Sequence, residues 1–185
     1  LGCPKNLVDS EVLLGRIAEE GSIVSRVEDA EVALLNTCCF VEAARKESLA
    51  ALEELIRRKR EGSLKGLIVT GCLAQRSAKE LEERFPEIDA IVGITAEHEI
   101  GPLLRDLGAR PRARILVRDP SRPFGAELGR LRLTPRHYAY LRIAEGCNHE
   151  CTFCAIPSFR GRFRSKREGA VLAEARELAR DGARE

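Results

Sequence analysis

Short apolar runs alternate with amphipathic segments across the first hundred residues. The runs at 32–35, 66–70 and 90–92 have the length and composition of buried strands. Around them lie four segments that carry apolar residues on one helical face and end at glycine, before proline or at a charged stretch: residues 7–20, 42–61, 77–84 and 97–107. This alternation predicts an α/β domain with a mainly parallel sheet.

The second half of the chain has a different pattern. Residues 108–136 contain four prolines and scattered arginines, which favours an interdomain linker, with a short strand at 115–117. Beyond it we expect a strand over 137–144, a functional loop and a helix over 168–180, which is how a (β/α) barrel begins. The predicted division is therefore 1–107, the linker 108–136, and the start of a barrel domain at 137–185.

Charge and hydropathy favour a cytoplasmic protein that uses no membrane. Charged residues make up 32% of the chain, and no apolar run approaches the roughly 20 residues of a membrane helix. Residues 1–104 hold 13 basic and 19 acidic side chains, whereas residues 105–185 hold 18 and 10. The basic second half suits either contact with nucleic acid or an RNA-bound protein, or an ordinary solvated surface.

The ends of the chain suggest a piece of a longer protein. There is no methionine, and the chain opens directly on a cysteine motif. We expect that a first strand before this motif and most of the barrel lie outside these 185 residues.

Seven cysteines are many for such a chain, and an odd number without a secretory signal argues against disulfides. Three of them, Cys147, Cys151 and Cys154, fall within eight residues. A tetrahedral zinc site needs four ligands, whereas three thiolates suit a [4Fe–4S] cluster with one iron left open. His149 as a fourth ligand and three unrelated buried thiols are the alternatives.

Three more cysteines are far apart in sequence. Cys38 and Cys72 each follow a predicted buried strand, and Cys3 would follow the strand expected before it. Because loops at the carboxyl ends of parallel strands converge on one crevice, these three could form a second triad or remain inert buried thiols. Cys39 adjoins Cys38, and neighbours in an extended chain point to opposite sides. One of the two therefore faces the crevice and the other the core.

The loop motif, with Phe153 before its last cysteine, resembles the signature of radical S-adenosylmethionine enzymes. In that superfamily the open iron chelates the amino and carboxylate groups of S-adenosyl-L-methionine, whose reductive cleavage gives a deoxyadenosyl radical. The resemblance implies that Phe153 lies beside the adenine, and packing in the core is the alternative.

The segments around Cys3, Cys38 and Cys72, in this order, resemble the N-terminal domain of methylthiotransferases. In that family a second cluster holds the sulfur that becomes the methylthio group. The resemblance implies two [4Fe–4S] clusters, assigns the ligand to Cys38, and leaves Cys39 as a small buried hydrophobe where the family usually has glycine. Lys166 stands where the family usually has arginine. The six implied metal ligands are Cys3, Cys38, Cys72, Cys147, Cys151 and Cys154.

Two segments, residues 1–6 and 156–161, resemble the ribosomal (RimO-type) branch of the family. That branch methylthiolates the β-carbon of an aspartate in ribosomal protein S-twelve, free or in the small ribosomal subunit. An electron donor protein and a sulfur donor are then implied, and no side chain is assigned as a catalytic acid or base. The tRNA (MiaB-type) branch usually has Gln-Met where Pro4-Lys5 stand here. That branch, and a non-enzymatic iron–sulfur or zinc module, are the rival interpretations.

Overall fold

A computed structural model describes residues 2–21, 25–26, 28–106, 114–121 and 124–185. Its centre is a parallel sheet of four strands in the order β1–β2–β3–β4. The register pairs Leu34 with Ile68, Ile68 with Ala90, and Ala90 with Arg114. The predicted α/β class with a parallel sheet is confirmed. The strands are β1 (Val32–Thr37), β2 (Gly66–Gly71), β3 (Ala90–Val92) and β4 (Arg114–Leu116).

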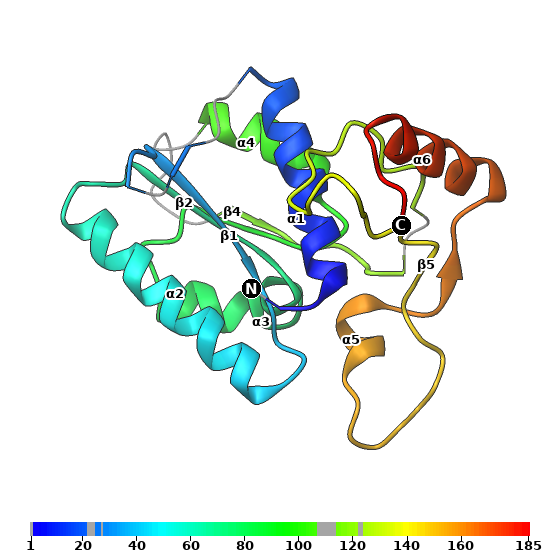
Figure 1. Ribbon diagram of the computed structural model, residues 1–185. Coiled ribbons are helices and arrows are strands. Elements are labelled where there is room, and N and C mark those ends of the chain that lie inside the picture. The colour runs from blue at the N-terminus through cyan, green and yellow to red at the C-terminus, as the bar shows by residue number, and fades with distance from the viewer. Residues whose placement is uncertain (1, 22–24, 27, 107–113, 122–123) are drawn as a thin grey trace.

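Helices cover both faces of this sheet (Figure 1). Leu67 and Val69 of β2 point into one hydrophobic cluster, and Ile68 points into the other. The strand is buried along its whole length, which explains its continuous apolar sequence. The first cluster is covered by α2 (Glu42–Arg60) and α3 (Cys72–Arg84), and the second by α1 (Pro4–Glu19) and α4 (Ile100–Asp106), which follows the 3-10 turn η1 (Glu97–Glu99).

Two helices begin earlier than the sequence pattern predicts. The first begins at Pro4, whose fixed φ suits the first helical position, and the Leu7 amide donates to the Cys3 carbonyl at 3.1 Å. Helix α3 begins at Cys72 directly after β2 and contains a kink at Ser77, with φ −127° and ψ 32°. The apolar pattern locates only the part of α3 beyond this kink. As a result, Cys3 and Cys72 both stand at helix N-termini.

The segment predicted to be a linker packs against the domain predicted over residues 1–107. Its expected short strand is present as β4, one residue earlier than predicted, and forms the edge of the sheet. Further along, the Leu131 and Leu133 amides donate to the backbone oxygen and the Oε1 of Glu11, at 3.0 and 2.9 Å. The division of the chain at 107 and 136 stays a prediction.

The strand predicted over 137–144 is wrong except at its end. Within the described range 124–185, β5 (Ala144–Glu145) is the only strand assigned to this segment, and it runs antiparallel to β6 (Arg164–Ser165). Side chains take the place of a neighbouring strand, because the carbonyls of Tyr138 and Tyr140 accept hydrogen bonds from Arg132, Thr134 and Arg130. The helix predicted over 168–180 is present as α6 (Glu168–Arg180), whereas α5 (Ile156–Arg160) was not predicted.

The far end of the same segment makes a different contact. The Ala139 amide donates to the Glu185 carbonyl at 2.9 Å, and the Glu185 amide donates to the His137 carbonyl at 3.2 Å. A residue bonded to both neighbours of its partner is the pattern of parallel strands.

Among the described residues, no helix has the length and apolar character needed to cross a bilayer.

Candidate functional site: two cysteine groups and a buried ion cluster

Cys72 is placed by a glycine. Gly71 has φ +94°, and a β-carbon there would lie 2.3 Å from the Thr37 carbonyl oxygen and the Asn36 Oδ1. Only glycine allows β2 to turn this sharply at so close an approach to β1. The turn places Cys72 at the first position of α3, at the carboxyl end of the sheet.

Cys38 and Cys39 are both buried and have different neighbours. The Ser48 hydroxyl of α2 accepts from the Cys38 amide at 2.9 Å and donates to the Cys38 carbonyl at 3.0 Å. A β-carbon at Gly2 would lie 3.2 Å from the Cys38 sulfur. Cys39 packs in the hydrophobic cluster that also contains Leu52 and Cys72. Burial raises the pKa of its thiol, and its proximity adds to the effect of burial in raising the pKa of the Cys72 thiol. Whether Cys38 is a ligand stays a prediction.

The side chain of Asn6 lies between Thr37 and Cys72, at the carboxyl ends of β1 and β2. Its Nδ2 donates to the Thr37 carbonyl at 3.3 Å, and its Oδ1 lies 3.9 Å from the Cys72 sulfur. Cys38 and Cys72 are buried, whereas Cys3 is exposed. Burial raises the pKa of the Cys72 thiol to about 12, although nearby Arg160 acts in the opposite direction.

The loop cysteines are more accessible. Cys151 is exposed, and Cys147 and Cys154 are half-buried. Gly146, with φ +77°, precedes Cys147, and the Cys147 amide donates to the Gly161 carbonyl at 3.1 Å. The His149 amide donates to the Cys147 sulfur at 3.5 Å. Backbone contacts therefore shape a loop whose three cysteines are at least partly accessible to solvent.

Phe153 lies in this loop with 91% of its surface exposed. Packing in the core, the alternative left open by the sequence, is therefore wrong. A place beside an adenine stays a prediction.

The donor chemistry of both groups fits an iron–sulfur cluster. Each offers three thiols, which are soft ligands suited to iron and sulfur. Across the part of the chain that the structure describes, no three His, Cys, Asp or Glu side chains are gathered so that they could hold a metal ion. The fit is one of donor type and shared neighbourhood, and the sulfur atoms would have to move closer to bind.

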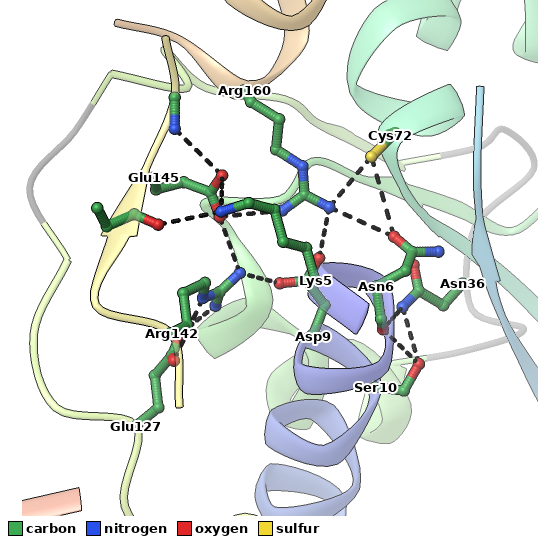
Figure 2. Close-up of polar contacts among 12 residues, drawn as sticks. Lys5, Asn6, Asp9, Ser10, Asn36, Cys72, Glu127, Arg142, Glu145 and Arg160 are labelled. Carbon is green, nitrogen blue, oxygen red and sulfur yellow. Dashed lines mark hydrogen bonds and ion pairs between the residues drawn. The ribbon is translucent and has the colours of Figure 1, made fainter. Parts of the chain in front are cut away.

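A cluster of buried ions joins the two halves of the molecule, and it was not foreseen from the sequence (Figure 2). Arg160 of α5 donates to Asp9 of α1 at 2.8 Å and to Glu145 of β5 at 3.3 Å. Arg142 pairs with the same two carboxylates and with Glu127. All five side chains are about one-tenth exposed or less. Charges far apart in sequence thus neutralise each other in the interior.

The ion pairs outweigh the cost of burying these carboxylates. Burial alone would raise the pKa of Asp9, but Arg142 and Arg160 lower it below its usual value. Burial also opposes ionisation of Glu145, and Arg160, Arg142 and Lys5 together lower its pKa. Both carboxylates are therefore ionised at neutral pH.

The basic run after the loop is only partly solvated. Arg160 is buried, and so is Lys166, which donates to Glu127 at 2.7 Å and to Glu174 at 2.5 Å. Both side chains are therefore buried among carboxylates instead of being solvated. Part of the excess positive charge of the second half is neutralised inside the protein.

A cavity of about 300 Å³ adjoins the ion cluster. Glu97 lines it, and burial, followed by the nearby charge of Asp9, raises the pKa of its carboxyl group to about 8. The cavity is therefore lined by a carboxyl group that keeps its proton at neutral pH. Other lining residues come from α1, the loop after β3 and the second half of the chain: Val12, Ile94, Phe124, Arg142 and Arg164.

Comparison with known proteins agrees with the resemblance seen in the sequence. The chain is 45% identical over its whole length to a Geobacter sulfurreducens protein named ribosomal protein uS12 methylthiotransferase RimO, and covers 42% of it. Proteins of the same name from Anaeromyxobacter sp. (strain K) and Clostridioides difficile are 45% and 41% identical over 98% and 100% of the chain, which covers 38% and 42% of them.

The chain thus spans about two fifths of the length of these relatives. Residues 1–93 match the family described as uncharacterized protein family UPF0004. These residues contain α1, the first three strands of the sheet and Cys3, Cys38 and Cys72. Since the match covers half of the chain, the protein belongs to the UPF0004 family.

Proposed function

We propose that the whole protein is a methylthiotransferase that modifies the β-carbon of an aspartate in ribosomal protein uS12. The observation that carries this proposal is the identity of 45% over the full chain to a relative of that name. The three cysteines at the carboxyl edge of the sheet and the three in the loop supply the thiols that such a reaction would need.

The proposal assigns a cluster to each group of cysteines. Cys147, Cys151 and Cys154 would hold one [4Fe–4S] cluster, and Cys3, Cys38 and Cys72 would hold the other. When bound there, the first cluster would supply the electron for radical formation from S-adenosyl-L-methionine. The second would supply the sulfur, and its methyl group would come from another molecule of S-adenosyl-L-methionine. Replacement of hydrogen on an unactivated carbon calls for a radical, because no side-chain base matches the pKa of such a proton.

The chain's own residues would hold and shield these centres. The buried thiols of Cys38 and Cys72 would have to give up their protons on binding metal, since thiolates are the ligands. The exposed ring of Phe153 would be free to cover the adenine of S-adenosyl-L-methionine.

The same proposal makes residues 137–185 the start of a (β/α) barrel. The parallel bonding of Glu185 to His137 and Ala139, with α6 between the paired segments, is what a β–α–β unit requires. The substrate of the whole protein would be uS12, free or in the small ribosomal subunit, and the protein would act in the cytoplasm. An electron donor protein and a sulfur donor would act with it.

The full-length gene product, reconstituted anaerobically, tests the proposal. Incubation with ribosomes and S-adenosyl-L-methionine should add a methylthio group to one aspartate of uS12, detected by mass spectrometry of the digested protein. A methylthio-nucleoside in tRNA together with unmodified uS12 would contradict it. Iron and sulfide analysis of the same sample separates it from a zinc-binding or purely electron-carrying module.

A further inference from the structure

Arg160 joins Cys72 to the residues that flank the loop of Cys147, Cys151 and Cys154. It is the last residue of α5 and 3% exposed. One of its terminal nitrogens, NH2, lies 3.1 Å from the Cys72 sulfur and 2.8 Å from Asp9 Oδ2. The same nitrogen lies 3.4 Å from Asn6 Oδ1, and the other terminal nitrogen lies 3.3 Å from Glu145 Oε2. Figure 2 shows the guanidinium between Cys72 and Asn6 on one side and Glu145 on the other.

These four partners come from three separate elements of the fold. Asn6 and Asp9 belong to α1, Cys72 begins α3, and Glu145 lies in β5. A planar guanidinium with five fixed donors can bond all of them at once, whereas a lysine ammonium is a single point charge. The site therefore uses the shape of arginine as well as its charge.

Arg160 also closes the loop that carries the other cysteines. Glu145 stands immediately before this loop and Arg160 shortly after it, so their ion pair joins its two ends. A backbone bond from the Cys147 amide to the Gly161 carbonyl closes it a second time. Lys5 of α1 attaches the same end of the loop, because its Nζ donates to the Ala144 carbonyl at 3.0 Å and to Glu145 at 3.1 Å.

We propose that Arg160 is a positioning residue that fixes the loop of Cys147, Cys151 and Cys154 relative to Cys72. One guanidinium clamps the ends of the loop through Glu145 and contacts the sulfur of Cys72 directly. The separation of the two cysteine groups then depends on this side chain. The inference rests on the function proposed above for its meaning in catalysis, although the clamp itself is a property of the protein without metal.

A second buried arginine provides a matched control. Arg130 lies 3.6 Å from Glu11, is equally buried, and donates to the Tyr140 carbonyl at 2.6 Å. It also joins the second half of the chain to α1, but its partners Glu11 and Tyr140 are neither cysteines nor residues of the loop. If the loss of any buried ion pair were enough to loosen the loop, replacing either arginine would loosen it equally.

The test compares Arg160→Met, Arg160→Lys and Arg130→Met in the full-length protein without metal, by amide hydrogen exchange. Arg160→Met should speed exchange in residues 147–161 about tenfold, because charged hydrogen bonds that close the loop are lost. Arg160→Lys should keep the pair with Asp9 but restore only part of the protection, and Arg130→Met should leave the loop unchanged. Equal effects of Arg160→Met and Arg130→Met, or no effect of either, would overturn the proposal.

Reconstituted protein gives a readout that a purely structural ion pair would not move. A hydrogen bond to a ligand sulfur sets the reduction potential of a cluster. Arg160→Met should therefore lower the reduction potential of the cluster held by Cys3, Cys38 and Cys72 (the front cluster), whereas Arg130→Met should not. Redox titration with electron paramagnetic resonance measures this potential. If Arg160→Met does not fold, Arg160→Lys decides by the same two measurements, and failure of both variants beside a folded Arg130→Met would mean a structural role only. Wild-type protein that takes up no iron would contradict the proposed function, and the exchange experiment would still judge the clamp.

Discussion

The two groups of cysteines are held in different ways. At the carboxyl end of the sheet, Cys38 makes two hydrogen bonds to Ser48. Cys72 follows a glycine that no other residue could replace without a clash. In the loop, Cys151 is exposed and Cys147 and Cys154 are half-buried. The first group takes its shape from the parallel sheet, and the second from contacts at the two ends of a loop.

The two groups should therefore differ in which step opposes metal binding. Buried thiols must lose protons inside a low-dielectric interior, and the pKa of Cys72 is about 12. Exposed thiols ionise more readily but must give up conformational freedom to gather around one centre. We therefore expect deprotonation of Cys72 to limit cluster assembly in the group of Cys3, Cys38 and Cys72 (the front group), and ordering of the chain to limit it in the loop group.

Removing one whole group gives the largest effect. In the full-length protein, replacing Cys147, Cys151 and Cys154 together with alanine should leave about half the iron and abolish deoxyadenosine formation. Replacing Cys3, Cys38 and Cys72 should also leave half the iron, but keep deoxyadenosine formation and lose the methylthio product. Iron analysis and chromatography of the nucleoside measure both. Loss of all iron in either variant would show that the groups do not act as separate sites.

The neighbours Cys38 and Cys39 sharpen the comparison within the front group. Cys38→Ala should lose the front cluster, whereas Cys39→Ala should keep both clusters and lose about 1 kcal/mol of stability, because it removes a buried sulfur from the hydrophobic core. Cluster absorbance and thermal unfolding of the two single variants test this. The reverse result would move the ligand to Cys39.

Thiol reactivity compares the two groups without any metal. In the reduced, metal-free 185-residue chain at neutral pH, Cys151 should react with iodoacetamide at least about a hundredfold faster than Cys72, since burial hides the latter and raises its pKa. Peptide mass spectrometry after timed quenching gives each rate. In urea the rates should become equal. Similar rates in the native protein would mean that the segment around Cys72 opens to solvent far more often than its burial implies.

The sequence predicted the part of the fold that follows a repeating pattern. Apolar runs located β1, β2 and β3 because both faces of the sheet are covered. The start of α3 was missed because Cys72 to Ser77 precede a kink that interrupts the helical period. Local patterns report local geometry, and both the successes and this miss follow from it.

The ion cluster could not be predicted from such patterns. Asp9 and Arg160 are 151 residues apart, and nothing in either segment indicates that they meet. An arginine in a basic run is usually solvated, so the burial of Arg160 depends on carboxylates contributed by α1 and β5. The same holds for the strand predicted over 137–144, because the carbonyls of Tyr138 and Tyr140 bond to side chains of residues 130–134. Long-range pairing decides such positions.

The last and smallest effect concerns Glu97, in the cavity beside the ion cluster that joins the two regions. Its pKa is about 8 in the folded protein, and an exposed glutamate has one near 4.3. Below about pH 4 both states are protonated. As the pH rises toward 8, the unfolded state releases this proton first, so the free energy of unfolding falls, and the loss is complete once the pH exceeds the folded value. Asp9 and Glu145 have the opposite sign, since their lowered pKa values stabilise the fold above about pH 4.

Glu97→Gln isolates this contribution, because glutamine has the shape of the protonated side chain and cannot ionise. The variant should match the wild-type chain near pH 4.5 and exceed it above pH 8, by on the order of 1 kcal/mol after allowance for partial solvent screening at the cavity mouth. Urea unfolding at several pH values, followed by circular dichroism, measures the difference. His98→Gln, one residue along and largely exposed, is the control and should show no such rise between pH 7 and 9. A constant difference between Glu97→Gln and wild type across this range would mean that Glu97 ionises normally and that the charges of Asp9 and Glu127 are screened from the cavity.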